Sequence, residues 1–396
     1  MNKKIFLFLW LLFWAPVLLA TNYPNTFVTN VDALLSNKVG ILNGNPVLLK
    51  AKAQLIAEVE KILEKNERYS VCYDKEVPFK GSIHDYYSLS RYAWPNPETE
   101  TGLPYVGRDG EVNPEIYSLQ DSYMLGSVCN EVYKLGLAYF YTEDERYVNW
   151  IKELIKVFFI EEATRMNPNF EYAQVVKGKT NTGGATIGAF PLVYLIDGIQ
   201  LVQTSKNWEM TNQDEIEKWF EAFFDWMLNS EKGKNQGRAP NNIGTYYTVQ
   251  VSTYALFLKK YDIAKDILLN QGKHRVDEQI NEFGELSFEL KRGNPFEYVK
   301  FAVTSFDLLM NLSSVLGVDL IKYKNSKGTG VLDVHYWLLP YALGDKKWDY
   351  SKEKVSKNQI AIVLLRSNLC ECSKYFYEQM GDLSCQVILT QLFFKI

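Results

Sequence analysis

Cysteine is scarce in this sequence, which limits metal binding and covalent cross-linking. The 396 residues include five cysteines, at positions 72, 129, 370, 372 and 385. The spacing of Cys370 and Cys372 is too tight for a normal zinc pair, and no histidine lies close by in sequence. We therefore predict no metal site and no cofactor. Because five is an odd number, at least one cysteine stays free or pairs between chains. The sequence does not decide whether two of Cys370, Cys372 and Cys385 form a disulfide.

The chain also lacks an excess of positive charge. Its formal net charge is −4, and it becomes −6 when the two charges of Lys3 and Lys4 are removed. A mildly acidic protein is a poor general binder of polyanions, so we expect no nucleic acid as a partner. A polyanionic substrate would need a locally basic cleft, which Arg238, Lys291 and Arg292 could supply. The sequence gives no indication of the oligomeric state.

No apolar run is long enough for a comfortable transmembrane helix. Residues 5–19 form an apolar run that follows Lys3 and Lys4 and precedes Ala20. This pattern is typical of a secretory signal peptide and is too short to span a membrane easily. No cysteine follows it, so we expect no lipid anchor. We predict that residues 1–20 direct export across the inner membrane and that the mature protein is periplasmic.

Aromatic residues are plentiful, at 14% of the chain with 26 tyrosines. Rings that stack on sugar faces suit a carbohydrate cleft, whereas the alternative is a tyrosine-rich helical core. The aromatic residues over 213–228 follow helical spacing, which favours core packing for that stripe.

Apolar residues recur at helical spacing along most of the chain, and no period-2 strand pattern is present. The expected helices cover 46–69, 117–141, 145–159, 190–203, 213–228, 242–260, 261–283, 298–316, 331–343 and 356–379. Short links, such as 142–144, favour antiparallel helical hairpins. The sequence therefore predicts an all-α array of such hairpins, with a single domain over 21–396.

Two long irregular segments, 71–114 and 167–188, interrupt the helices. A loop this long in a compact domain is usually functional, and the first is rich in proline and aromatic residues. We expect it to form one wall of a cleft, with its polar and aromatic side chains as candidate substrate contacts: His84, Tyr86, Tyr87 and Trp94. For His84, a hydrogen bond inside the loop is an equally good interpretation.

The stretch 241–250 (Asn-Asn-Ile-Gly-Thr-Tyr-Tyr-Thr-Val-Gln) begins a buried apolar segment after a loop over 233–240. Asn241 or Asn242 can cap the helix, because a short side-chain oxygen satisfies free N–H groups of the first turn. Two amides and two tyrosines at a helix start also form a polar, aromatic cluster of the sort that binds a sugar. The alternative is a plain cap above core tyrosines, which would include Tyr246.

A second stretch, 289–298 (Glu-Leu-Lys-Arg-Gly-Asn-Pro-Phe-Glu-Tyr), places Arg292 six residues before Tyr298 across a Gly-Asn-Pro turn. Arginine is a permanent cation whose planar fork fits a carboxylate. Tyrosine can pass a proton when a neighbouring cation lowers its pKa. Amide, arginine and tyrosine are the set that β-elimination of a uronic acid needs, because the carboxylate must be neutralised before the C5 proton becomes acidic.

Together these stretches resemble the Asn-Asn-His-Gly-Thr-Trp-Tyr and Arg…His-Tyr motifs of alginate-lyase-type polysaccharide lyases. Upstream segments also match, at 84–89 with 94–97, 103–105 with 108–114, and 163–169, so the resemblance spans roughly 80–350 in the family's order. It implies an incomplete α/α toroid with long cleft-forming loops. It also implies a secreted lyase that acts on alginate or a related polyuronate such as glucuronan.

The resemblance assigns roles to individual residues. Asn242 and Arg292 would hold and neutralise the uronate carboxylate, and Tyr298 would carry the proton. The other substrate contacts would come from the motif and its basic surroundings: Asn241, Tyr246, Arg238 and Lys291.

The chain departs from the family at Ile243 and Glu297, where histidine is usual. In mannuronate and glucuronate, the C5 proton and O4 lie on the same ring face. One tyrosine can therefore remove the C5 proton and then protonate the leaving O4. In guluronate they lie on opposite faces and a second group is required. We therefore hypothesise that Ile243 biases the protein towards syn elimination on mannuronate-type or glucuronate-type links.

Two other functions fit the same sequence. The protein could be a catalytically impaired relative that binds acidic polysaccharide, because Ile243 cannot move a proton and Glu297 adds negative charge beside Tyr298. It could also be an α/α-toroid glycoside hydrolase, which needs two catalytic carboxylates. The available carboxylates are Asp85, Asp109, Glu111 and Glu297, and no spacing selects a pair.

Overall fold

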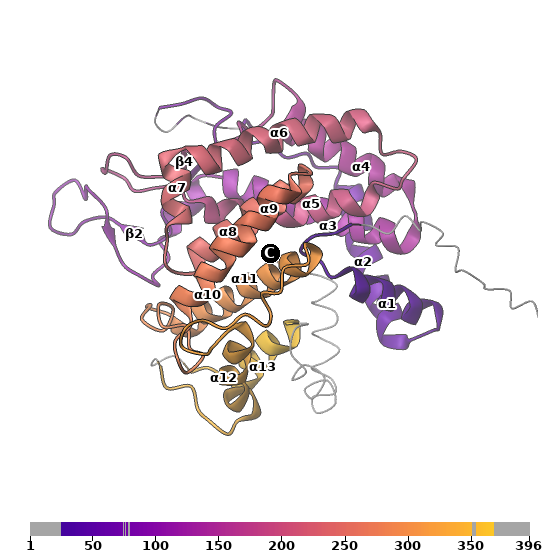
Figure 1. Ribbon diagram of the computed structural model, residues 1–396. Helices are drawn as coiled ribbons and strands as arrows, with labels where there is room; N and C mark the ends of the chain where they lie inside the picture. Colours follow the sequence, from indigo (N-terminus) through magenta and orange to yellow (C-terminus); the bar gives the residue numbers. More distant parts are fainter. Residues whose placement is uncertain (1–24, 74, 76, 78–79, 351–353, 368–396) are drawn as a thin grey trace, which may run out of the picture.

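The computed structural model describes residues 25–73, 75, 77, 80–350 and 354–367 (Figure 1). The predicted signal peptide, the three C-terminal cysteines and the end of the last predicted helix lie outside these residues. Cys72 and Cys129, which lie within them, are both free thiols. None of the helices in the described part of the chain combines the length and the apolar character needed to cross a bilayer.

Helices dominate the structure, as predicted. The α-helices are α1 (Val31–Leu42), α2 (Pro46–Lys65), α3 (Asp121–Thr142), α4 (Glu145–Ile155), α5 (Leu192–Val202), α6 (Met210–Asn229), α7 (Glu231–Gly237), α8 (Asn242–Phe257), α9 (Tyr261–Ile267), α10 (Lys273–Gln279), α11 (Pro295–Val315), α12 (Val331–Leu343) and α13 (Lys357–Arg366). Short 3-10 turns cover Pro114–Ser118 and Thr186–Ala189, and π-helical turns cover Lys156–Ile160 and Leu268–Gly272.

The predicted fold class is confirmed: the helices form an incomplete α/α toroid. Figure 1 shows α1 and α2 at the right, α6 along the top, α8 and α11 in the middle and α12 and α13 at the bottom. Helices that follow each other in sequence pack as pairs, including α3 with α4, α8 with α9 and α12 with α13.

Two features differ from the expectations. Residues 231–237, expected in part as a loop, form the short helix α7, because the Ser230 hydroxyl caps it by accepting from the Gly233 N–H at 2.9 Å. The irregular segments also contain four short strands, β1 (Tyr87–Leu89), β2 (Ala93–Trp94), β3 (Val106–Gly107) and β4 (Tyr172–Val175). β1 pairs in parallel with β4, and β2 pairs antiparallel with β3. Strands this short leave no readable period-2 pattern.

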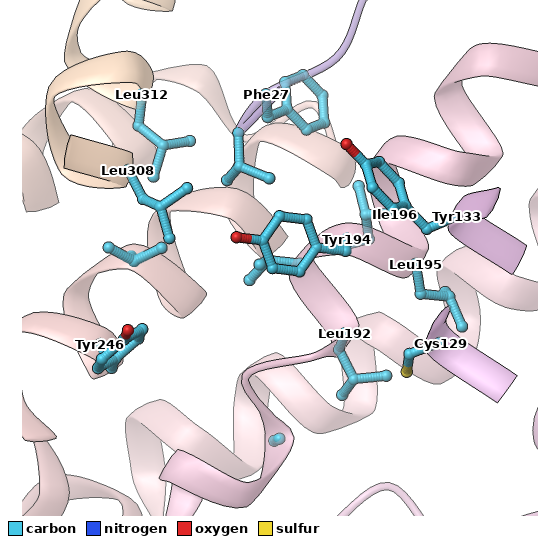
Figure 2. Close-up of a cluster of buried hydrophobic side chains, with 14 of the residues drawn as sticks. Phe27, Cys129, Tyr133, Leu192, Tyr194, Leu195, Ile196, Tyr246, Leu308 and Leu312 are labelled. Carbon is cyan, nitrogen blue, oxygen red and sulfur yellow. The ribbon is translucent and has the colours of Figure 1, made fainter. Parts of the chain in front are cut away.

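The core is centred where α3 and α5 cross. A Cβ atom on Gly136 would lie 2.6 Å from the carbonyl oxygen of Gly198, so the two backbones touch and neither position tolerates a side chain. Figure 2 shows Tyr133, Tyr194 and Leu308 in one buried cluster, contributed by α3, α5 and α11. Aromatic side chains bury a large area each, so most of the tyrosine content in this region serves packing.

The segment before α1 is held to this core by Asp197 on α5. The carboxylate is fully buried and accepts hydrogen bonds from the backbone N–H groups of Phe27 at 2.7 Å, Val28 at 3.1 Å and Thr29 at 2.6 Å. Burial raises the pKa of Asp197 to about 6, against the opposing effect of these donors. One side chain on α5 thus ties the N-terminal part of the described chain to the centre of the fold.

Replacing this carboxylate tests that role. Asp197→Ala leaves three N–H groups without an acceptor, and each buried unsatisfied group costs roughly 1–3 kcal/mol. We therefore expect the free energy of unfolding to fall by about 3 kcal/mol or more, measured by urea denaturation. Asp197→Asn keeps one accepting oxygen but replaces the other with an NH2 donor that meets a backbone N–H, so its loss should be smaller than that of Asp197→Ala and still measurable. A loss of less than about 1 kcal/mol for Asp197→Ala would show that the carboxylate does not hold the segment.

Candidate active site

The first motif lies at the start of α8, as predicted. Asn241 is the N-cap, and its side-chain oxygen accepts from the Ile243 N–H at 3.2 Å. The helix behind it is buried along nearly its whole length. Ile243 is half-buried, so the position where the family usually has histidine lies at the edge of the core. The cap therefore presents Asn241, Asn242 and Ile243 at one end of an otherwise enclosed helix.

Asn242 is held by a residue of the second motif, Glu289. The Glu289 carboxylate accepts from the Asn242 backbone N–H at 2.8 Å and from its side-chain amide at 2.9 Å. Both residues are buried, and burial raises the pKa of Glu289. Because an amide nitrogen carries two hydrogens, one Asn242 N–H remains available for another acceptor.

Two side chains of α10 support the same loop from behind. The buried guanidinium of Arg275 donates to the carbonyl oxygens of Gly237 at 2.5 Å and Ala239 at 3.2 Å. Gln279 donates to the Asn241 carbonyl at 3.0 Å and accepts from the Thr245 hydroxyl at 3.1 Å. Burial lowers the pKa of Arg275, and nearby Glu278 opposes that shift. The motif loop is therefore positioned by α10, which sequence inspection did not single out.

The second motif brings Arg292 against Tyr298 and adds a partner from a distant segment. The Arg292 guanidinium carbon lies 3.7 Å from the centre of the Tyr298 ring. Asp109, which follows β3, accepts from Arg292 through both carboxylate oxygens, at 2.7 Å from Nη2 and 3.0 Å from Nε. It also accepts from the Tyr298 hydroxyl at 3.1 Å and the Gly293 N–H at 2.9 Å.

These contacts determine the protonation states of Asp109 and Tyr298. The hydrogen bonds from Arg292 lower the pKa of Asp109 to about 2, so this carboxyl is ionised near neutral pH. Burial and a hydrogen bond with Tyr92 raise the pKa of Tyr298 well above its usual range, and they outweigh Arg292, which lowers it. Tyr298 is therefore a neutral phenol in this structure. Arg292 lowers the pKa of Tyr298, as predicted for a neighbouring cation, but burial raises this pKa by more.

Three predicted substrate contacts belong to the core instead, which corrects those expectations. Tyr246 is fully buried, and its hydroxyl donates to the Phe301 carbonyl at 3.0 Å. Tyr86 is buried and stacks on Phe170 with ring centres 4.2 Å apart. Tyr87 is also buried, and its hydroxyl donates to the Lys80 carbonyl at 2.6 Å. These rings face protein on all sides, so they have no surface on which a sugar could stack.

The remaining predicted contacts lie nearer the surface. The Nδ1 atom of His84 lies 2.8 Å from the Arg165 carbonyl, which is outside the 71–114 segment, and 3.2 Å from the Cys72 sulfur, which is inside it. Trp94 is half-buried, with its indole N–H donating to the Glu111 carbonyl at 2.9 Å. Arg238 and Lys291 are exposed, and Arg238 donates to the Asn235 side chain at 3.1 Å.

Two carboxylates proposed for hydrolysis are unsuited to it. Asp109, with its pKa near 2, cannot serve as a general acid near neutral pH. Asp85 is buried and accepts from the side chains of Asn167 at 2.8 Å and Asn169 at 3.3 Å.

Glu297 pairs with Lys300 at 2.5 Å, so its charge beside Tyr298 is largely compensated.

Comparisons with known proteins place the chain among alginate lyases in sequence and fold. The family model described as alginate lyase matches residues 70–348. Among solved structures, an alginate lyase from Bacteroides ovatus is 27% identical with a TM-score of 0.79, over 94% of this chain and 96% of that one. No curated protein sequence matches the chain.

More distant structures share the fold alone. Alginate lyase A1-III from Sphingomonas species A1 is 13% identical with a TM-score of 0.54, over 95% of this chain and 97% of that one. A variant of alginate lyase A1-III complexed with a tetrasaccharide is 13% identical with a TM-score of 0.57, over 94% of this chain and 96% of that one.

Proposed function

The chain belongs to the alginate lyase family and is a polysaccharide lyase, and we propose that it cleaves alginate or a related polyuronate by β-elimination through Arg292, Asn242 and Tyr298. One observation supports the proposal: residues of the single 289–298 segment contact Asn242 at one end and join Arg292 to Tyr298 at the other. Glu289 holds Asn242, and Arg292 stacks on Tyr298 within the same short stretch. Carboxylate binding and proton transfer can therefore act on one sugar.

The reaction breaks two bonds and forms one double bond. A base removes the C5 proton, the electron pair forms the C4–C5 double bond, and the C4–O4 bond breaks as O4 takes a proton. The difficult step is removal of the C5 proton, because negative charge then spreads onto the carboxylate. Arg292 and the free N–H of Asn242 are donors suited to that charge, and such stabilisation is usually the largest catalytic contribution.

Tyr298 is the proposed proton carrier. As a neutral phenol it can protonate the leaving O4 directly. To accept the C5 proton it must first release its own proton to solvent, and the Arg292 cation on its ring favours the phenolate that results. The phenolate then takes the C5 proton and passes it to O4, so it ends the cycle as a phenolate again. Asn241, Trp94, Arg238 and Lys291 remain proposed contacts for the rest of the polymer.

The stereochemistry is proposed from Ile243. With no histidine at this position, a base on the opposite ring face is missing, so we propose syn elimination on mannuronate or glucuronate links. The test measures ultraviolet absorbance of the unsaturated product with polymannuronate, polyguluronate and glucuronan. We expect a rise with polymannuronate or glucuronan and little with polyguluronate.

The variant Ile243→His restores the usual family residue and tests whether position 243 determines which links are cleaved. It should add cleavage of polyguluronate, because it restores a second proton acceptor at the position where the family usually has histidine. Polyguluronate cleavage at a good rate by the wild-type protein would contradict the syn assignment. Unchanged activity of Ile243→His on all three polymers would mean that position 243 takes no part in catalysis.

A second candidate is a family member that binds acidic polysaccharide and cuts it poorly. Asp109 favours this candidate, because its carboxylate already neutralises the Arg292 fork in the structure. The same absorbance measurement separates the two. A flat trace on all three polymers, together with retained binding, would select the binding protein.

Export and domain organisation are proposed from the sequence pattern. We propose that residues 1–20 are a signal peptide, that residues 21–396 form one domain, and that the mature protein works in the periplasm. The mass of the protein recovered from the periplasm of an expressing cell checks the first claim, since retention of residues 1–20 would contradict it.

A further inference from the structure

The Asp109 carboxylate accepts hydrogen bonds at both of its oxygens from a set of four donor groups. One oxygen accepts from Arg292 Nη2 and from the Tyr298 hydroxyl, and the other accepts from Arg292 Nε and from the Gly293 N–H. A two-pronged arginine contact with further N–H and O–H donors is the arrangement by which proteins recognise carboxylates from outside. Here the carboxylate is the protein's own.

The position of Asp109 follows from the backbone. Gly110, with φ of +83°, turns the chain so that it packs against the 293–294 backbone. A Cβ atom on Gly293 would lie 2.5 Å from the Asp109 carbonyl oxygen, so the two segments touch directly. The β2–β3 pair thereby delivers Asp109 to residues about 180 positions away in sequence. The side chain itself remains 41% exposed, while that of Arg292 is 25% exposed. Solvent, and hence another anion, can therefore reach the pair.

We propose that Asp109 occupies, in the free protein, the place that a uronate carboxylate takes in the complex, so that the substrate binds only by displacing it. The inference rests on the proposed function, in which Arg292 binds the uronate. Asp109 and a uronate present the same charged group, and the Nε–Nη2 edge of Arg292 holds one carboxylate at a time. The two must compete.

Competition of this kind lowers apparent affinity without changing the contacts in the complex. The observed affinity equals the intrinsic affinity multiplied by the fraction of molecules in which the fork is free. A single uronate exchanges one carboxylate for another and gains little. A longer chain gains additional contacts from neighbouring sugars, which can drive the exchange. Asp109 therefore lowers the observed affinity for every uronate ligand by the same factor, and a polymer, with its additional contacts, still binds where a single uronic acid does not.

The test compares the affinity of Asp109→Asn and wild type for D-glucuronate, which has no glycosidic bond to cleave. Asparagine keeps the size of the side chain and removes its charge. We expect the variant to bind glucuronate about tenfold more tightly in calorimetry at low salt, as a freed fork requires. D-mannuronate, which also has no glycosidic bond to cleave, should gain by the same factor because it needs the same free fork. Asp319→Asn, which removes one exposed negative charge beside Lys322, is the matched control and should leave both affinities unchanged.

Equal or weaker glucuronate binding by both Asp109→Asn and Asp109→Ala would overturn the proposal and leave Asp109 as a positioning residue for Arg292. Should one variant lose its fold by circular dichroism, the glucuronate affinity of the other still decides. Because binding needs no turnover, this result is separate from the absorbance test. A protein that forms no unsaturated product defeats the proposed function, whereas the competition is judged by binding alone.

Discussion

Tyr298→Phe is expected to reduce the absorbance rise by about 10³-fold or more on every polymer that the wild type cleaves, in line with the loss of a group that serves as both acid and base. Phenylalanine keeps the aromatic ring beneath Arg292, which lies 3.7 Å from its centre, and removes only the hydroxyl. The carboxylate site stays assembled while the proton path is lost. The rate of product formation at saturating polymer is the measurement, since the loss should fall on kcat.

Tyr261→Phe is the matched control for this change. Tyr261 is 52% exposed at the start of α9, so removal of its hydroxyl should not alter the rate. Binding of polymannuronate by Tyr298→Phe should persist, because Arg292 and Asn242 are untouched. A Tyr298→Phe rate within tenfold of wild type would remove Tyr298 from the chemistry and point to another proton carrier.

Arg292→Ala is the second large expected loss, at about 10²–10³-fold in kcat/KM, the usual effect of removing one donor to a developing oxyanion. The variant removes the cation that neutralises the uronate and also leaves Asp109 without its main partner. Arg292→Lys keeps the charge but not the planar fork, so it should recover only part of the rate. Steady-state kinetics on the best polymer give the comparison.

Arg238→Ala serves as the control for Arg292. Arg238 is also a proposed contact, but it is exposed and bonded only through Asn235, so we expect a loss of less than tenfold, mainly in KM. Urea denaturation of both variants separates folding from catalysis, because Arg292 is only 25% exposed and its two-pronged pair with Asp109 can stabilise the fold. Equal losses for Arg292→Ala and Arg238→Ala would show that general positive charge, and not the Arg292 fork, serves the substrate.

The helices and the family were readable from the sequence alone. Helical spacing of apolar residues predicted most of the long helices between 46 and 366, because a helix must bury one stripe of its surface wherever it packs, whereas α7 and the short strands were not predicted. The ordered motifs at 84–114, 163–169, 241–250 and 289–298 indicated the alginate lyase family, which the family model confirms over 70–348. Local chemistry also limited the helix cap to Asn241 or Asn242 and showed the short arginine-to-tyrosine spacing of the second motif, and the structure selects Asn241 as the cap.

Side-chain burial and long-range partners were decided only by the tertiary structure. Tyrosine has an apolar ring and a polar tip, so its sequence context could not tell that Tyr246 faces the core while Tyr298 faces Asp109. Spacing along one element does not reveal a partner supplied by another. Glu289 meets Asn242 from 47 residues away, and Asp109 meets Arg292 from 183 residues away. The sequence by itself determined which groups the chain carries for uronate chemistry, and the packing of the β2–β3 pair against the 293–294 turn decided which carboxylate faces the arginine.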